Sequence, residues 1–148
     1  MLDKSNVLIL VPAFNEQASV GAVLHDLRLS GFQVLLISDG SKDDTAEIGR
    51  SAGVPVLELP INLGVGGALR AGFKFAERKS FLAIVQIDAD GQHPIEEIEN
   101  LIKVGNSVGA HMVIGSRFKS KNSTLEVTGI RRMAMNCLLY TSPSPRDS

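Results

Sequence analysis

The sequence predicts an α/β domain with a Rossmann-like, mostly parallel sheet and helices on both of its faces. Short apolar runs that suit buried strands alternate along the chain with segments whose apolar residues follow helical spacing. The strand segments are apolar on both faces, which is typical of parallel sheets covered by helices on each side. Right-handed crossovers are then expected to join successive strands.

Five apolar runs define the expected strands. The first spans residues 7–11 and is stopped by Pro12, the second spans 34–37 and stops before Ser38, and the third spans 54–59 and is ended by Pro60. The fourth spans residues 81–87, and the short run 112–114 is the fifth. We therefore expect a sheet of five strands.

The segments between these runs carry helical signals. Ser41 and Asp44 have the spacing of a capping box, which favours structural roles for Asp43 and Asp44 in the first turn of a helix. A glycine-rich stretch opens a further helix after the third strand. Apolar residues recur at helical spacing after the first and fourth strands, namely Val20, Val23, Leu24 and Leu27, and Ile95, Ile98, Leu101 and Ile102.

Composition limits the function classes. The chain has 148 residues, of which 44% are hydrophobic and 21% charged, with a formal net charge of -1. These values indicate one globular domain, and the absence of a Lys/Arg block argues against a nucleic-acid partner. The sequence holds no apolar stretch of membrane-spanning length, and its start lacks the features of a signal peptide. We expect a cytoplasmic protein.

The end of the chain differs from the rest. Residues 137–147 match one reading frame of a widely used transposase sequencing adapter, so we expect residues 137–148 to be a non-native, disordered tail of a truncated gene product. A natural Ser/Pro-rich linker is the alternative. In either case we expect residues 1–136 to form the domain, and we assign no function to Cys137 or to the residues after it.

Polar motifs follow all five expected strands, at the edge where ligands bind in sheets of this kind. Asp88 and Asp90 come directly after the fourth strand. Mg²⁺ and Mn²⁺ take oxygen ligands and are commonly shared between one or two carboxylates and substrate phosphates. The pair therefore predicts a metal site, with turn chemistry as the simpler alternative.

Taken together, five ordered motifs resemble the family 2 glycosyltransferases of GT-A fold, nearest the dolichyl- or polyprenyl-phosphate mannosyl- and glucosyltransferase branch. The resemblance covers residues 7 to about 118. The motifs are VPAFNE at 11–16, SDGSKDDT at 38–45, NLGVGGALRAG at 62–72, QIDADGQHP at 86–94 and GSRF at 115–118.

The resemblance implies transfer of a sugar, with inversion, from a nucleoside diphosphate sugar of the GDP-mannose or UDP-glucose type to polyprenyl or dolichyl phosphate. A glycan hydroxyl is the alternative acceptor. Asp88, Asp90 and Gln92 would hold Mg²⁺ or Mn²⁺, and Asp88, Asp90 and Arg117 would be catalytic. The implied nucleotide-sugar contacts are Pro12, Ala13, Phe14, Asn15, Glu16, Asp39, Gly40, Asn62, Gly64, Gly67, Asp88, Ala89, Asp90 and Arg117.

The resemblance also implies that acceptor recognition and membrane contact, at the inner face of the membrane, belong to missing C-terminal parts. This chain would then keep donor recognition without turnover.

Each implied role has a structural alternative. Asp39 could belong to a simple Asp-Gly turn, Asn15 could cap the first helix with Glu16 in its first turn, and the glycines could serve close helix packing. Two other functions stay open. One is a nucleotidyltransferase, although the loop after the first strand lacks the expected glycines. The other is a receiver-like signalling module with Asp39 or Asp88 as phosphoacceptor.

Overall fold

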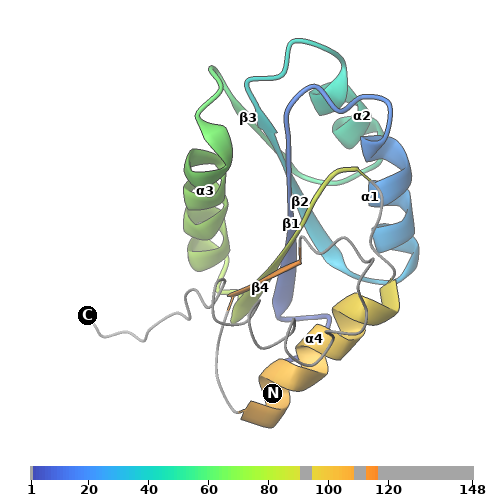
Figure 1. Ribbon diagram of the computed structural model, residues 1–148, viewed down its shortest axis with the longest axis vertical. Helices are drawn as coiled ribbons and strands as arrows, with labels where there is room; N and C mark the ends of the chain where they lie inside the picture. The colour runs from blue at the N-terminus through green and yellow to red at the C-terminus, as the bar shows by residue number, and fades with distance from the viewer. Residues whose placement is uncertain (1, 91–94, 109–112, 117–148) are drawn as a thin grey trace, which may run out of the picture.

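A computed structural model describes residues 2–90, 95–108 and 113–116, which form a parallel sheet between two layers of helices (Figure 1). Strands and helices alternate along the chain, as the apolar pattern predicts. The elements are β1 (Val7–Ala13), α1 (Val20–Leu29), β2 (Gln33–Asp39), α2 (Thr45–Ser51), β3 (Val56–Leu59), α3 (Gly64–Arg78), β4 (Ala83–Ile87), α4 (Ile95–Val108) and β5 (Val113–Ser116).

The sheet has the strand order β3-β2-β1-β4-β5, and all four neighbouring pairs are parallel. The central strand β1 pairs with β2 through Leu8 to Ala13 and with β4 through Val7 to Leu10. After β1, the chain adds β2 and then β3 on one side of it, and afterwards β4 and β5 on the other side. This reversal creates a switch point between β1 and β4, where open α/β sheets bind their ligands.

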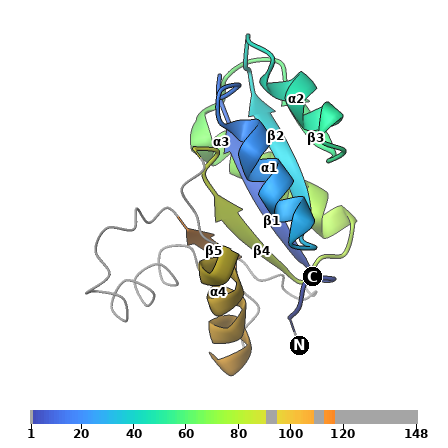
Figure 2. The same ribbon diagram turned by 90° about the vertical axis from the view of Figure 1, so that its right-hand side faces the viewer.

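The two faces of the sheet are covered unequally. Val7, Ile9 and Val11 of β1 point into a core shared with α1, α2 and α4, whereas Leu8 and Leu10 point into a core shared with α3. This division follows from the two-residue period of a strand. Figures 1 and 2 show α3 on one side of the sheet and the other three helices on the opposite side. The predicted α/β fold with helices on both faces is confirmed.

Some strand boundaries differ from the predicted ones. Pro12 does not stop β1, which continues to Ala13. Beyond Leu10 the strand pairs with β2 alone, so one side of its end forms no hydrogen bonds with a neighbouring strand. Proline, which has no N–H to donate, is tolerated at such a position. The third strand starts at Val56 rather than at residue 54, and the carbonyl of Pro55 accepts a hydrogen bond from Leu36 N (3.1 Å). The fourth strand starts at Ala83, and the fifth spans Val113–Ser116.

Candidate functional site

A pocket of about 280 Å³ opens at the carboxyl ends of β1, β2 and β4. It joins segments that are far apart in the sequence, because parallel strands bring the loops that follow them to one edge. Its described lining consists of Pro12, Ala13, Phe14, Glu16, Asp39, Val65, Gln86, Asp88, Ala89 and Asp90. Eight of these ten residues belong to the contacts predicted from the sequence.

Asp88 and Asp90 both line this pocket. Asp88 is half-buried directly after β4, Asp90 is exposed, and Ala89 between them is buried. The Ser19 hydroxyl, at the start of α1, donates a hydrogen bond of 2.6 Å to the carbonyl of Ala89. The turn that carries the two carboxylates is therefore tied to the helix after β1. The structure thus brings the predicted metal-binding pair to the edge of the sheet where the switch point lies.

Asp39 is buried at the end of β2, with 5% of its surface exposed. Its two carboxylate oxygens accept hydrogen bonds from the backbone N–H groups of Leu63 (2.7 Å) and Gly64 (3.0 Å), where α3 begins. The carboxylate therefore satisfies two donors at a helix N-terminus and places its negative charge at the positive end of the helix dipole. Its contact with a nucleotide sugar stays a prediction.

Replacing Asp39 with alanine is expected to lower the free energy of unfolding by about 1–2 kcal/mol, because two backbone donors of α3 lose their acceptor. Asp39→Asn keeps one acceptor oxygen and should lose less. Urea denaturation followed by circular dichroism measures the difference. Asp26→Ala, at an exposed position of α1, is the control and should leave the midpoint nearly unchanged. Equal midpoints for all the variants and the wild type would contradict this role of Asp39.

In the loop after β1, Pro12, Ala13, Phe14 and Glu16 line the pocket, but Asn15 lies outside the lining. The alternative that Asn15 caps the first helix is wrong, since α1 begins at Val20 with Ser19 at its N-cap. Glu16 for the same reason lies outside the first turn. Asn15 instead has a positive φ of 53° and hydrogen bonds to the loop after β2. Its role as a nucleotide contact stays a prediction.

The predicted capping box is wrong as well. Helix α2 begins at Thr45, and its N-cap is Asp44 rather than Ser41. The N-cap side chain makes no capping hydrogen bond, so the cap that the Ser41–Asp44 spacing indicates does not form. The Ser41 hydroxyl accepts a hydrogen bond from the backbone of Asn15 (3.0 Å). Asp43 does have the structural role expected of it, because it accepts hydrogen bonds from Thr45 and Gln17. Both Ser41 and Asp43 thus have hydrogen-bond partners in the loop after β1, which is distant in the sequence.

Four other predicted contacts, Gly40, Asn62, Gly64 and Gly67, also lie outside the described lining. The Asn62 amide donates to the carbonyl of Asp39 (3.1 Å), and Gly64 has a φ of +86°. A Cβ at Gly67 would lie 2.5 Å from the Leu63 side chain, so local packing accounts for that glycine. All four residues therefore have structural roles in or against the β3–α3 connection, and Gly40 lies against the backbone of Ile61 and Asn62 there. Their contact with a ligand stays a prediction.

The sequence prediction missed Val65 and Gln86, which complete the described lining. Gln86 was detectable as the single polar residue in β4, two positions before Asp88 and therefore on the same face of the strand. Val65 gave no signal, because an apolar residue near the start of a helix is unremarkable in sequence. Its exposed fraction of 60% in the folded chain distinguishes it.

Two predicted residues, Gln92 and Arg117, lie outside the described residues. Within the part of the chain that the structure describes, no group of three or more His, Cys, Asp or Glu side chains could hold a metal ion. The role of Asp88 and Asp90 as metal ligands stays a prediction.

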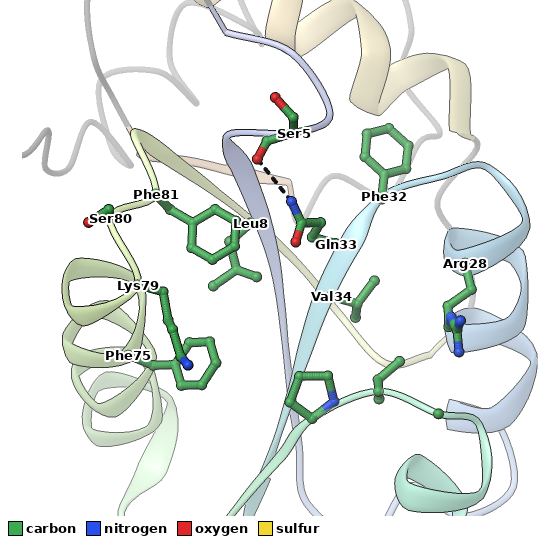
Figure 3. A pocket seen from close by; sticks show the side chains of 13 residues that line it. Ser5, Leu8, Arg28, Phe32, Gln33, Val34, Phe75, Lys79, Ser80 and Phe81 are labelled. Carbon is green, nitrogen blue, oxygen red and sulfur yellow. Dashed lines mark hydrogen bonds between the residues drawn. The ribbon is translucent and has the colours of Figure 1, made fainter.

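A second cavity, of about 630 Å³, lies near the amino ends of β1 and β2, away from the predicted residues (Figure 3). Phe75 of α3 and Lys79, just after that helix, border it on one side, and Arg28 of α1 borders it on the other. The Gln33 amide donates to the Ser5 carbonyl across it (2.9 Å). None of the described residues in its lining is a carboxylate. Its described lining thus lacks the carboxylate pair that lines the first pocket.

The sequence model described as "Glycosyl transferase family 2" matches residues 8–146. The chain belongs to this family. The family 2 chain is 31% identical over 121 residues to a polyprenol monophosphomannose synthase of Mycolicibacterium smegmatis, covering 75% of this chain and 44% of that protein. It is 33% identical over 118 residues to an undecaprenyl-phosphate mannosyltransferase of Micrococcus luteus, covering 75% and 48%. The family 2 chain spans about half the length of these curated relatives.

Solved structures agree with the fold of the family 2 chain. A glucosyl-3-phosphoglycerate synthase from Mycobacterium tuberculosis, in complex with Mn²⁺, UDP-glucose and phosphoglyceric acid, matches with a TM-score of 0.60 and 21% identity. The match covers 88% of this chain and 49% of that one. It supports the GT-A, Rossmann-like architecture. Among the helices that the structure describes, none combines the length and apolar character needed to cross a bilayer.

Proposed function

We propose that the chain is the donor-binding part of a glycosyltransferase that uses a nucleoside diphosphate sugar of the GDP-mannose or UDP-glucose type. The observation that carries this proposal is the single pocket shared by Asp39, the loop after β1, and the Asp88–Asp90 pair. The acceptor we propose is polyprenyl or dolichyl phosphate. Two relatives named for polyprenol and undecaprenyl phosphate support that class of acceptor, and a glycan hydroxyl is the alternative.

The charge of the pocket indicates how a diphosphate would be held. Its described lining contains four carboxylates, Glu16, Asp39, Asp88 and Asp90, and no Lys or Arg. A diphosphate entering such a pocket alone would be repelled by like charges. Asp88 and Asp90 would hold a divalent cation, whose charge would offset that repulsion, and carboxylate oxygens suit Mg²⁺ or Mn²⁺.

When bound, the cation would act as a Lewis acid and template for the departing diphosphate. Asp88 and Asp90 would hold it, and we propose Gln92 as a further oxygen ligand. Arg117 is proposed to grip a phosphate, which suits the guanidinium fork. Phe14, which is 47% exposed at the rim of the pocket, presents an apolar surface to the nucleoside.

In the proposed reaction an acceptor oxygen forms a bond to the anomeric carbon of the sugar. The bond from that carbon to the diphosphate oxygen breaks, and the configuration at the carbon inverts. A lipid phosphate is already anionic and needs no strong base, whereas a sugar hydroxyl must lose its proton to one. Stabilising the charge that develops on the diphosphate is then the main task of the pocket.

Because the chain spans about half the length of its relatives, we place acceptor recognition and membrane contact, at the inner face of the membrane, outside residues 1–136. A receiver-like module with Asp39 as phosphoacceptor is less consistent with the site, because both oxygens of Asp39 accept backbone hydrogen bonds. Membership of family 2 also argues against a nucleotidyltransferase.

Isothermal titration calorimetry with GDP and UDP, each with and without Mn²⁺, tests the proposal. We expect one of the two nucleotides to bind, with an affinity at least about tenfold higher when the metal is present. Equal affinity in the two conditions would contradict the role given to Asp88 and Asp90. A thermal-shift screen of nucleotide sugars with Mn²⁺ then identifies the donor, because a ligand that binds the native state raises the melting temperature.

A further inference from the structure

Three consecutive backbone N–H groups in the loop after β1 donate to side chains of the loop after β2. Asn15 N donates to Ser41 Oγ (3.0 Å), Glu16 N to Thr45 Oγ1 (2.9 Å), and Gln17 N to Asp43 Oδ2 (3.2 Å). Backbone N–H groups are strong hydrogen-bond donors, and each of these three has a partner within the protein. Here the partners are side chains from a segment about 26 residues further along the chain.

The exchange is reciprocal. The backbone N–H of Lys42 donates to Asn15 Oδ1 (2.8 Å), and that of Asp44 donates to Gln17 Oε1 (3.1 Å). Each loop therefore uses its side chains to satisfy the backbone of the other. We call residues 15–17 and 41–45, joined by these five hydrogen bonds, the loop clamp.

Thr45 lies at the centre of the loop clamp and is fully buried. Its hydroxyl accepts the hydrogen bond from Glu16 N and donates its own proton to Asp43 Oδ1. Burial acts to raise the pKa of Asp43, but the hydrogen bonds from the hydroxyl and amide of Thr45 and from the Gln17 amide outweigh it and lower that pKa. The carboxylate thus stays charged and orients the Thr45 hydroxyl, whose lone pairs face Glu16.

The loop clamp also holds the backbone in an uncommon conformation. Asn15 has a φ of 53°, in the left-handed region that costs about 1 kcal/mol or more for most residues. Its N–H and its side-chain oxygen are both hydrogen-bonded to the other loop. On either side of it, Phe14 and Glu16 line the pocket. The loop clamp therefore fixes the turn from which two pocket residues project.

We infer that Thr45 is a positioning residue for donor binding, acting through the Glu16 backbone to hold Phe14 and Glu16 in the pocket. This inference takes its ligand from the proposed function, and so rests on it. The loop clamp itself is independent of that proposal, because its hydrogen bonds are seen in the structure. Thr45 does not line the pocket, so its effect on a ligand must pass through the loop after β1.

The test compares Thr45→Val, which removes the hydroxyl while keeping the side-chain shape, with Thr45→Ser, which keeps the hydroxyl. Calorimetry with Mn²⁺ and whichever of GDP and UDP binds the wild type measures affinity. We expect Thr45→Val to weaken binding about fivefold or more, and Thr45→Ser to stay within about twofold of the wild type. Ile48→Val is the control for a general loss of stability, because Ile48 packs α2 against the core without entering the loop clamp.

Amide hydrogen exchange of residues 15–17 is the second measurement. It should be slow in the wild type and Thr45→Ser and fast in Thr45→Val, with exchange in β1 and β4 unchanged. Wild-type affinity in Thr45→Val, or an equal loss in Ile48→Val, would overturn the inference. If the wild type binds neither nucleotide, the proposed function fails. Hydrogen exchange still tests whether Thr45 holds the loop clamp together in that case. Amides of residues 15–17 that stay protected in Thr45→Val would refute this role of Thr45.

Discussion

Asp90→Asn is expected to weaken the binding of GDP or UDP about tenfold or more in the presence of Mn²⁺, and to leave binding of the matching free nucleoside nearly unchanged. The substitution keeps the size of the side chain but removes one of the two charges that would hold a cation against the diphosphate. Asp90 is exposed at the mouth of the pocket, so the change should not disturb the core. Titration calorimetry with the nucleotide and with the nucleoside separates the two effects.

Asp26→Asn provides the matched control for this experiment. Asp26 is an exposed carboxylate on α1 outside the pocket lining, and its substitution changes the net charge of the chain by the same amount. It should bind both ligands as the wild type does. Equal losses of affinity for nucleotide and nucleoside in Asp90→Asn would contradict a position of Asp90 near the phosphates. A similar loss of affinity in Asp26→Asn would show that the effect of Asp90→Asn comes from long-range electrostatics and not from a local contact.

Gly40→Ala is expected to lower the free energy of unfolding by about 2–4 kcal/mol, for two physical reasons. Gly40 has a φ of +74°, which disfavours any residue with a side chain. A Cβ at this position would also lie 2.4 Å from Asn62 N and 2.6 Å from Ile61 C, and these are backbone atoms that cannot rotate away. Urea denaturation followed by circular dichroism measures the loss.

Gly66→Ala is the control for Gly40→Ala. A Cβ built at Gly66 would point into open space, and this exposed residue is in the first turn of α3. Alanine favours the helical conformation, so the variant should match the wild type or gain up to about 1 kcal/mol. If Gly40→Ala proved as stable as Gly66→Ala, the close crossing of the two loops would not constrain the fold.

The sequence predicted the fold well because apolar periodicity and strand–helix alternation are local signals. The runs containing Val7 to Val11 and Val34 to Ile37 are strands, and their parallel order brings Asp39, Asp88 and Asp90 to one pocket. Burying both faces of a strand requires helices on both sides, so the layers follow from composition. The convergence of motifs at strand ends then follows from the topology.

What the sequence did not predict depends on hydrogen bonds between distant segments. The spacing of Ser41 and Asp44 indicated a local cap, but Ser41 is taken by Asn15, which is 26 positions away. Asp39 was predicted as a nucleotide-sugar contact, and nothing in the sequence indicated that its carboxylate also binds the start of α3, 24 and 25 positions further on. Local spacing carries no information about such partners, because the register between loops is set only when the sheet forms.

The loop clamp has a consequence for how this chain could handle anions. Many phosphate-binding loops gather successive backbone N–H groups into an anion-binding nest. After β1 of this chain, the N–H groups of Asn15, Glu16 and Gln17 are committed to the neighbouring loop. With those hydrogen bonds in place, these three amides can build no nest for a diphosphate.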